Sequence, residues 1–453
     1  MKIKQFEDKG LAHYSYAILS ECESQIVLID PARNITEYLE YAKTNDAKII
    51  GVIETHPHAD FVSGHLELYK VTGATLYCSK LVGAAYPHQG FDNGDVISFG
   101  KIKLKSLNTP GHSPDSISVV LEHEDKDKAV FTGDTLFIGD CGRPDLRENA
   151  GNVTAKREEL AAQMYHSLRE SLMPLADEVI VYPAHGAGTL CGKALSDANH
   201  STIGAEKISN WSLKEMTEKE FVKELTADQP FVPKYFPYDV GLNKEGAADR
   251  EKSLSAVKFG ATDGSSASLP TIQKEIVIID TRTAAEYRKG HLPNSINLMY
   301  GGKFETWLGS IVTPHERYYL AADGHAQLEL LMEKTAKIGY EPLIKEAINV
   351  TGGPVSNPEF DLQAFKADQE AYTIVDVRNP AEVKEHPVFK HAINIPLYQL
   401  RERVKEIPVD KPIAVHCASG YRSAAGTSIV ADALNGTALV YDISDDIKTF
   451  TEH

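Results

Sequence analysis

Short apolar runs recur along the first half of the chain, and each one ends in a polar tip that bears Asp or His. The runs are SQIVLIDP, AKIIGVIETH, KIKLKSLNTPGH, KAVFTGDTLF and ADEVIVYPAHG. Apolar runs of this length, bounded by turn residues, are typical of buried strands. Since the strands end in metal-ligand residue types, we expect a site assembled at one edge of a layered α/β fold.

The second half of the chain contains an internal repeat. Segment 275–298, EIVIIDTRTAAEYRKGHLPNSINL, resembles segment 371–397, AYTIVDVRNPAEVKEHPVFKHAINIPL. Each has a β-rich run that ends in Asp-x-Arg, then an Ala-Glu pair, then Ile-Asn near the next strand. A spacing of about 96 residues makes each copy the size of a small domain, not of a solenoid repeat.

The stretch between the two halves predicts a connector. Residues 229–252, QPFVPKYFPYDVGLNKEGAADREK, are rich in Pro and Gly and then become charged. A length of 453 residues fits two or three domains. We therefore expect three domains, at residues 1–245, 250–353 and 354–453.

Composition limits which classes of partner and which cellular compartment we expect for this protein. The net charge of −17 argues against nucleic acid or an anionic membrane as a partner. No apolar run approaches the roughly 18 residues of a membrane span, and the start lacks the apolar stretch of a signal peptide. Five widely spaced cysteines argue for a reducing environment, so we expect a cytoplasmic protein.

The polar tips of the first half predict a metal centre. Neutral imidazole and carboxylate are ligands that suit Zn²⁺, Fe²⁺ and Mn²⁺. Two of the histidines stand two residues apart, so on an extended segment their side chains point the same way. The candidate ligands are His56, His58, Asp60, His112, Asp134 and His185.

The order of these residues resembles the metallo-β-lactamase superfamily over roughly residues 1–245. This resemblance implies an αββα sandwich, and the repeat that follows implies two further α/β domains. In binuclear hydrolases of the superfamily, an Asp-His pair helps to hold a second metal. Here the pair is Asp60-Phe61, and a phenyl ring cannot ligate, which favours a single metal. His65, one helical turn beyond Phe61, is an alternative ligand.

A site with His56, His112 and Asp134 as ligands would have the two-histidine, one-carboxylate arrangement that suits non-haem Fe(II). The segment FTGDTLFIGDCGRPDL resembles the Gly-Arg-x-Asp segment of persulfide dioxygenases in this superfamily. The resemblance implies one Fe(II) per chain at these three residues. It also implies that His58, Asp60 and His185 orient the ligands. Those dioxygenases usually keep the Asp-His pair, from which this sequence departs.

Two more residues of this region are candidates for function. Arg143 is predicted to bind substrate or to brace the site, because a guanidinium can hold a carboxylate with two hydrogen bonds. A salt bridge with Asp145 is the structural alternative. Cys191 follows His185 by six residues, and fused persulfide dioxygenases often carry a Cys here, which makes it a candidate for sulfur relay. It is otherwise a small buried apolar residue.

The segment AVHCASGYRSAAG predicts a second reactive site. An apolar strand leads to Cys417, then to a short loop with Gly420, then to an Ala-rich helix start. Loop N–H groups and a helix N-terminus stabilise a negative sulfur, and Arg422 adds a positive charge. The segment resembles the rhodanese active-site loop. Its C-x4-R spacing is one residue shorter than in related phosphatases, which disfavours a phosphatase.

The first copy of the repeat lacks this chemistry. Ala321 replaces the cysteine, Ala326 replaces the arginine, and Asp323 adds a negative charge. This copy is expected to be inactive, and it serves either to dock the other domains or to cover the metal site.

The whole chain thus resembles a persulfide dioxygenase–rhodanese fusion, with the inactive rhodanese-like copy in the middle. The resemblance implies oxidation of a small thiol persulfide by O₂ to sulfite and thiol, and formation of thiosulfate through Cys417. It implies sulfite as a further small-molecule partner, and the inactive copy suggests a homo-oligomer. Two alternatives stay open: a glyoxalase II-type thioester hydrolase, and a non-catalytic persulfide carrier or sensor that uses Cys191 and Cys417.

Overall fold

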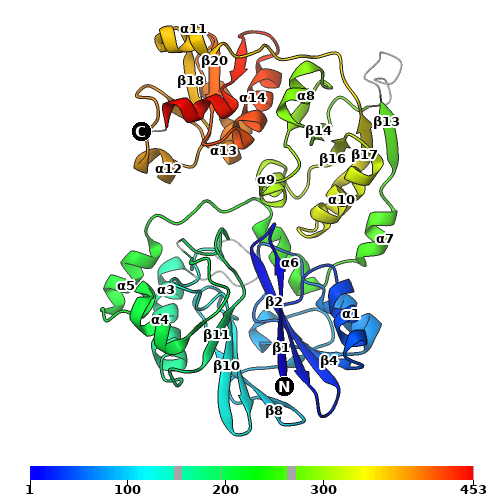
Figure 1. Cartoon of the computed structure of the whole chain (residues 1–453), viewed down its shortest axis with the longest axis vertical. Coiled ribbons are helices and arrows are strands. Elements are labelled where there is room, and N and C mark those ends of the chain that lie inside the picture. The colour runs from blue at the N-terminus through cyan, green and yellow to red at the C-terminus, as the bar shows by residue number, and fades with distance from the viewer. Residues whose placement is uncertain (147–155, 194, 263–271, 452–453) are drawn as a thin grey trace. The chain divides into compact units, whose positions relative to one another are not determined.

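The computed structural model describes residues 1–146, 156–193, 195–262 and 272–451 (Figure 1). The chain divides into two compact units. The first comprises Met1–Arg250 with Lys337–Gly339, and the second comprises Glu251–Ala336 with Tyr340–His453. No helix in the described part of the chain combines the length and the apolarity that crossing a bilayer requires.

The first unit contains two six-stranded sheets. The first sheet has the order β1-β2-β3-β4-β5-β6, with β1 (Lys2–Asp8), β2 (His13–Ser20), β3 (Gln25–Ile29), β4 (Lys48–Ile53), β5 (Thr75–Cys78) and β6 (Gln89–Gly90). The second has the order β12-β11-β10-β9-β8-β7, with β7 (Val96–Phe99), β8 (Ile102–Asn108), β9 (Ile117–His123), β10 (Lys126–Gly133), β11 (Ile180–Pro183) and β12 (Ser201–Thr202).

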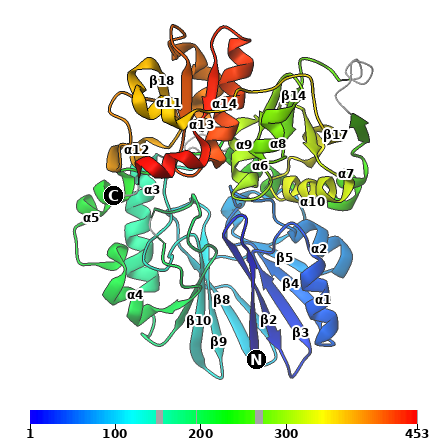
Figure 2. The same cartoon turned by 45° about the horizontal axis from the view of Figure 1, so that its top comes forward.

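Helices cover the outer face of each sheet of this unit, as Figure 2 shows. The helices of this unit are α1 (Thr36–Thr44), α2 (His65–Thr72), α3 (Arg157–His166), α4 (Ile203–Ser209), α5 (Glu218–Thr226) and α6 (Phe236–Glu245). Helices α1 and α2 pack on the first sheet, and α3, α4 and α5 pack on the second.

Strand β3 shows why its sequence is apolar at every central position. Val27 and Ile29 point into the core between the sheets, whereas Ile26 and Leu28 pack toward α1 and α2. Because successive side chains of a strand point to opposite faces, a strand buried on both faces reads as a continuous apolar run. This confirms the predicted αββα sandwich.

The strands predicted to carry ligand residues are confirmed as β3, β4, β8, β10 and β11. Strands β3 and β4 run parallel to each other, and so do β10 and β11. Parallel neighbours bring their carboxyl ends to the same edge of a sheet. The loops that follow them are therefore placed to build one site.

The predicted connector at residues 229–252 is wrong in part. This stretch contains helix α6, and Phe236, Asp239, Val240 and Asn243 of the helix are buried within the first unit. Pro237 lies at the helix start, where its missing N–H costs nothing. Pro237 and Gly246 therefore mark the two ends of a helix, and Gly241 lies within it.

The second unit contains two parallel sheets. The first has the order β13-β17-β16-β14-β15, with β13 (Phe259–Thr262), β14 (Val277–Asp280), β15 (Ser295–Asn297), β16 (Tyr318–Ala322) and β17 (Ile344–Val350). The second has the order β19-β18-β20-β21, with β18 (Thr373–Asp376), β19 (Ile393–Asn394), β20 (Ile413–His416) and β21 (Val440–Asp442). The helices are α7 (Arg250–Ser255), α8 (Ala284–Lys289), α9 (Phe304–Ile311), α10 (His325–Ala336), α11 (Leu362–Ala367), α12 (Pro380–Glu385), α13 (Leu397–Arg403) and α14 (Tyr421–Leu434).

The two copies of the repeat share their local chemistry. In the first copy, Arg282 donates two hydrogen bonds to Asp280 from Nε and one from Nη2. Arg378 and Asp376 repeat these contacts in the second copy. Each pair fixes the loop that leaves the strand. The Asp-x-Arg signature therefore has a structural role, because its ion pair holds the loop in place. The repeat is confirmed as two rhodanese-like α/β folds.

Candidate functional site

Three residues from three loops of the first unit meet at one edge of the two sheets. His56 follows β4, His112 follows β8, and Asp134 follows β10. The Nε2 atoms of His56 and His112 lie 3.8 and 3.4 Å from Asp134 Oδ2. All three side chains are buried, and their ligand atoms lie within 4.8 Å of one another. The sequence-predicted ligand set is therefore brought together.

Hydrogen bonds at Nδ1 turn Nε2 of both imidazoles toward Asp134. Thr55 Oγ1 donates to Asp30 Oδ2 at 2.8 Å, so it accepts from His56 Nδ1 at 3.0 Å. The carbonyl oxygen of Arg143 accepts from His112 Nδ1 at 2.9 Å. A protonated Nδ1 leaves the Nε2 lone pair available, and a fixed ring orientation is what a metal ligand needs.

The donor set fits a divalent cation. In the described part of the chain, neither carboxylate oxygen of Asp134 has a hydrogen-bond partner, although the side chain is buried. An unpaired buried carboxylate is costly unless a cation compensates it. Burial also lowers the pKa of His112, although Asp134 opposes this effect, so its imidazole favours the neutral form that ligates a metal.

His58, Asp60 and His185 form a second group beside this one. His185 Nε2 lies 3.4 Å from Asp60 Oδ2 and 3.5 Å from Asp134 Oδ1. Burial alone would lower the pKa of His185, but Asp60 and Asp134 raise it well above its ordinary value. Burial raises the pKa of Asp60, but His185 lowers it to about 2 overall. The two groups therefore attract each other, which fits a pair that orients its neighbours.

The cysteine loop of the second unit lies between β20 and α14. Gly420 has a φ of 91°, the left-handed region that favours glycine, and its N–H donates to Cys417 Sγ at 3.2 Å. Cys417 is 1% exposed. A backbone donor aimed at the sulfur at a helix start is the arrangement that stabilises a negative sulfur.

Arg422 lies in the first turn of α14. Its Nη1 and Nη2 donate to the two oxygens of Glu382 at 2.5 and 2.7 Å. Burial lowers the pKa of the guanidinium, but Glu382 raises it overall. Arg422 is thus a fixed cation on the C-x4-R loop, with two of its five N–H groups used by Glu382.

Comparison with known proteins assigns parts of the chain to two families. Residues 10–185 match the metallo-beta-lactamase superfamily, and residues 267–355 and 361–453 each match the rhodanese-like domain. Persulfide dioxygenase ETHE1 of Mus musculus is 30% identical over 242 residues, which are 53% of this chain and 85% of the mouse protein. The chain belongs to the metallo-β-lactamase superfamily as a persulfide dioxygenase–rhodanese fusion.

Two further relatives bear on this assignment. A crystal structure of a metallo-beta-lactamase from Staphylococcus aureus subsp. aureus COL covers 77% of this fusion and 99% of that chain, with a TM-score of 0.67 and 30% sequence identity. The cytoplasmic hydroxyacylglutathione hydrolase of Arabidopsis thaliana is 33% identical over 181 residues, which are 38% of this chain and 63% of that protein. The hydrolase thus matches a smaller share of this chain than the persulfide dioxygenase does.

Phe61 fills the space beside Asp60 in this fusion protein. Its ring is 1% exposed and lies 3.9 Å from the ring of His13 and 4.3 Å from that of His58, centre to centre. The alternative ligand His65 does not replace it. The Nδ1 of His65 lies 3.8 Å from Glu54 Oε1, and no metal-binding group among the described residues includes His65.

Sequence reasoning missed three residues that support the metal centre. Asp30 accepts from the backbone N–H of Thr55 at 2.7 Å and lies 3.1 Å from His58 Nε2. The sequence could have indicated Asp30, because this residue stands at the polar tip of the apolar run SQIVLIDP. His13 is buried among these side chains, and burial lowers its pKa to about 3. Asn243 of α6 donates to the carbonyl oxygens of residues 58 and 61 at 2.8 and 2.7 Å, a contact without a local signal.

The structure does not support a substrate contact by Arg143. Its side chain is 1% exposed and donates twice to Asp145, at 2.7 Å each. The other N–H groups donate to the carbonyl oxygens of residues 190, 230 and 231. All five donors are thus used within the protein. Since its backbone also binds His112, Arg143 braces the metal site, and the predicted substrate role is corrected.

Cys191 lies beside the metal centre. Its sulfur lies within 4.8 Å of ligand atoms of Asp134 and His185, and the residue is 1% exposed. Burial first, and then Asp60 and Asp134, raise the pKa of the thiol above its ordinary value. A protonated thiol is a poor nucleophile. The location thus agrees with a role near the metal, whereas the environment opposes a thiolate.

The first rhodanese-like copy has no nucleophile at the equivalent loop. Ala321 and Ala322 end β16 with both side chains buried, and Asp323 and Gly324 follow. The Gly324 N–H donates to Asn349 Oδ1, so this loop donates to a neutral side chain where the second copy donates to sulfur.

Proposed function

We propose that this fusion oxidises a low-molecular-weight thiol persulfide with O₂ and water to sulfite and free thiol. The observation that carries the proposal is the buried group of His56, His112 and Asp134, together with the 30% identity to a persulfide dioxygenase over most of that protein. Phe61 supports a single metal, since it removes a ligand from the second position.

One Fe(II) per chain is the cofactor that this donor set fits, held by His56, His112 and Asp134. Bound Fe(II) would supply the redox chemistry that the reaction of O₂ with sulfur requires. The protein's own part is to hold the ligands rigidly. Arg143 and Thr55 fix the rings of His112 and His56.

The residues around the metal would orient the ligands and enclose the substrate. We assign this supporting role to His58, Asp60 and His185, on the basis of the close approach of His185 to Asp60 and the contact of His58 with Asp30. Cys191 is the candidate for relay of sulfur near the metal, which would require its thiol to lose a proton.

The second reaction of the proposal is sulfur transfer through Cys417. The Cys417 thiolate attacks the outer sulfur of a second persulfide, forms an S–S bond, and releases the thiol. Sulfite then attacks the outer sulfur of the Cys417 persulfide, which leaves thiosulfate and regenerates the thiolate. The Gly420 N–H stabilises the negative sulfur in both steps, and Arg422 is the candidate for attracting anionic substrates.

The two reactions connect, because sulfite from the first is the acceptor in the second. The physiological result would be removal of sulfide-derived persulfides. We place this chemistry in the cytoplasm, and we place the three domains at 1–245, 250–353 and 354–453. Thioester hydrolysis is the second candidate, since a hydroxyacylglutathione hydrolase is 33% identical over 181 residues of this chain.

The test combines metal analysis with oxygen-electrode assays. Anaerobically prepared protein should contain iron, and it should consume O₂ with a thiol persulfide. His112→Ala should abolish O₂ uptake, whereas Cys417→Ser should leave uptake intact and shift the product from thiosulfate to sulfite. Protein that holds two zinc ions per chain and hydrolyses a glutathione thioester would instead establish the hydrolase.

The Cys417→Ser arm also separates the enzyme from a persulfide carrier. A carrier would bind persulfide without sustained O₂ uptake in any variant. An unchanged thiosulfate yield in Cys417→Ser would move the transfer step to Cys191.

A further inference from the structure

The rhodanese-like copy without a nucleophile contacts the start of the helix that follows Cys417. The hydroxyl of Tyr421, the first residue of α14, donates to the carbonyl oxygen of Met299 at 3.1 Å. Gly302 lies against the same ring, and a Cβ at this position would stand 3.2 Å from a ring carbon of Tyr421. The chain at Gly302 has a φ of 52°, so it reaches the ring in a conformation that suits glycine.

Arg422 is also flanked by the inactive copy. Its guanidinium carbon lies 5.9 Å from the centre of the Trp307 ring, and Trp307 belongs to α9. Glu382 holds the two Nη atoms of the same guanidinium from the active copy. A carboxylate at one edge and an aromatic face at cation–π distance restrict a side chain that otherwise has many rotamers.

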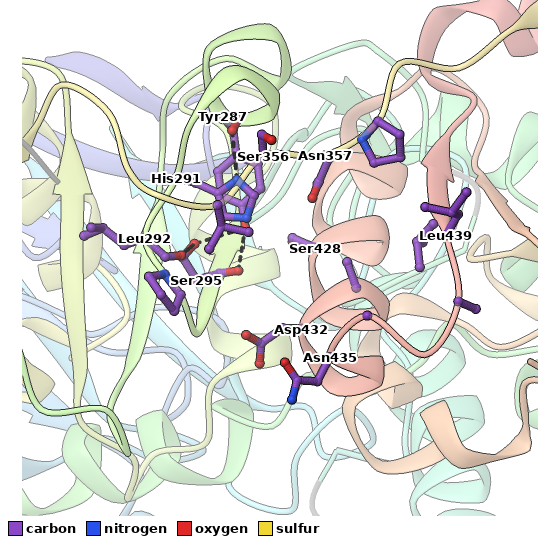
Figure 3. A pocket seen from close by; sticks show the side chains of 17 residues that line it. Tyr287, His291, Leu292, Ser295, Ser356, Asn357, Ser428, Asp432, Asn435 and Leu439 are labelled. Carbon is purple, nitrogen blue, oxygen red and sulfur yellow. Dashed lines mark hydrogen bonds between the residues drawn. The ribbon is translucent and has the colours of Figure 1, made fainter. Parts of the chain in front are cut away.

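The remainder of α14 rests on the same inactive copy. Ser428 Oγ accepts from the backbone N–H of Asn297, and Asp432 Oδ1 accepts from that of Asn294, each at 2.9 Å. Figure 3 shows Ser428 and Asp432 on α14 across a cavity of about 280 Å³ from Ser295 and His291. Beside this cavity the helix is held by backbone donors of the inactive copy, so its placement does not depend on the active copy alone.

We propose that the inactive copy completes the sulfur-transfer site, with Trp307 as a positioning residue for Arg422. The Met299 carbonyl and Gly302 hold Tyr421, and Trp307 holds the next residue of the helix. Both contacts act on the helix start that follows Gly420, whose N–H points at Cys417. The function of the middle domain is thus to shape a site whose nucleophile lies elsewhere. The inference deepens the proposed function, and for its reaction it rests on that proposal.

The test compares Trp307→Ala with Trp307→Phe in the full chain. Trp307→Ala should lower kcat/KM for sulfur transfer from a thiol persulfide to sulfite about tenfold, the size of effect that loss of a partly desolvated cation–π contact produces. Trp307→Phe keeps an aromatic face and should recover most of the rate. Phe259→Ala is the matched control, because this half-exposed ring of the same copy contacts His325 and not α14.

A second measurement does not depend on the proposed reaction. The rate of alkylation of Cys417 by iodoacetamide at fixed pH, read on the Cys417 peptide by mass spectrometry, should fall in Trp307→Ala and recover in Trp307→Phe. Tyr421→Phe removes only the hydroxyl and should lower both rates by a smaller factor. Wild-type values in both Trp307→Ala and Tyr421→Phe would overturn the inference. Altered alkylation without any sulfur transfer in the wild type would overturn the proposed reaction instead.

Discussion

Phe61 follows Asp60 in the chain, at the position where a histidine would offer a further metal ligand. The ring packs between His13 and His58, so it also occupies the volume that a histidine ligand would need. Asp60 and His185 nevertheless remain beside it as an ion pair. The carboxylate of Asp60 thus lies beside an imidazole that can compensate its charge.

The substitution Phe61→His tests this interpretation. Histidine would stand next to Asp60 and close to His58, and the variant should bind a second metal equivalent when it is reconstituted with Zn²⁺. Phe61→Leu, which keeps an apolar side chain, should retain the stoichiometry of the wild type. Metal content per chain, measured by mass spectrometry of the purified proteins, decides the matter. Equal metal content in all three proteins would show that Phe61 does not limit the site.

At the scale of elements, the metal centre depends on the close approach of two loops. The loop after β8 carries His112, and the loop after β10 carries Asp134 and Gly142. The second loop turns back after Asp134, so that Gly142 lies against it. A Cβ at position 142 would stand 1.9 Å from the carbonyl oxygen of Asp134 and 3.0 Å from His112 Nδ1. Backbone atoms cannot move aside as a side chain can, so only glycine fits here.

Gly142→Ala should therefore displace two predicted ligands together. We expect the variant to lose most of its bound metal while it stays folded, because metal geometry tolerates much smaller shifts than packing does. Gly241→Ala in helix α6 is the control, since no atom lies within 4 Å of a Cβ there. Metal analysis alongside circular dichroism measures both properties. Full metal occupancy in Gly142→Ala would contradict the argument.

At the scale of the whole molecule, each compact unit carries its own chemistry and its own spectroscopic reporter. The chain has two tryptophans: Trp211 lies in the first unit and Trp307 in the second. The metal group lies entirely in the first unit, and the cysteine loop lies entirely in the second. Binding of metal should therefore stabilise only the unit that Trp211 reports.

Chelation of the metal provides the corresponding prediction. In Trp307→Phe, urea unfolding followed by Trp211 fluorescence should lose about 3–4 kcal/mol of unfolding free energy on metal removal, as expected for a metal held at a hundred to a thousand times its Kd. In Trp211→Phe, the transition reported by Trp307 should be unaffected by the chelator. An equal shift of both transitions would mean that the units unfold together.

Much of the fold and of the site could be predicted from the sequence because the relevant signals are local. Runs such as SQIVLIDP and VFTGDTLF place their ligand residues at strand ends, and the repeated Asp-x-Arg marks equivalent strands. The C-x4-R spacing defines a loop of known size around Cys417. These features depend on residues a few positions apart in the sequence, so they can be recognised without knowledge of the tertiary packing.

The tertiary structure alone decided which distant residues support these sites. Asn243 binds the loop at 58–61 from a helix that looked like a connector, and all five donors of Arg143 are used within the protein. Likewise, Trp307 stands beside Arg422 across more than a hundred residues of sequence. Such contacts arise from the packing of whole elements, and no periodicity or spacing encodes them. The sequence therefore determined the candidate reactive residues, because their signals are local, and packing determined what holds them in place.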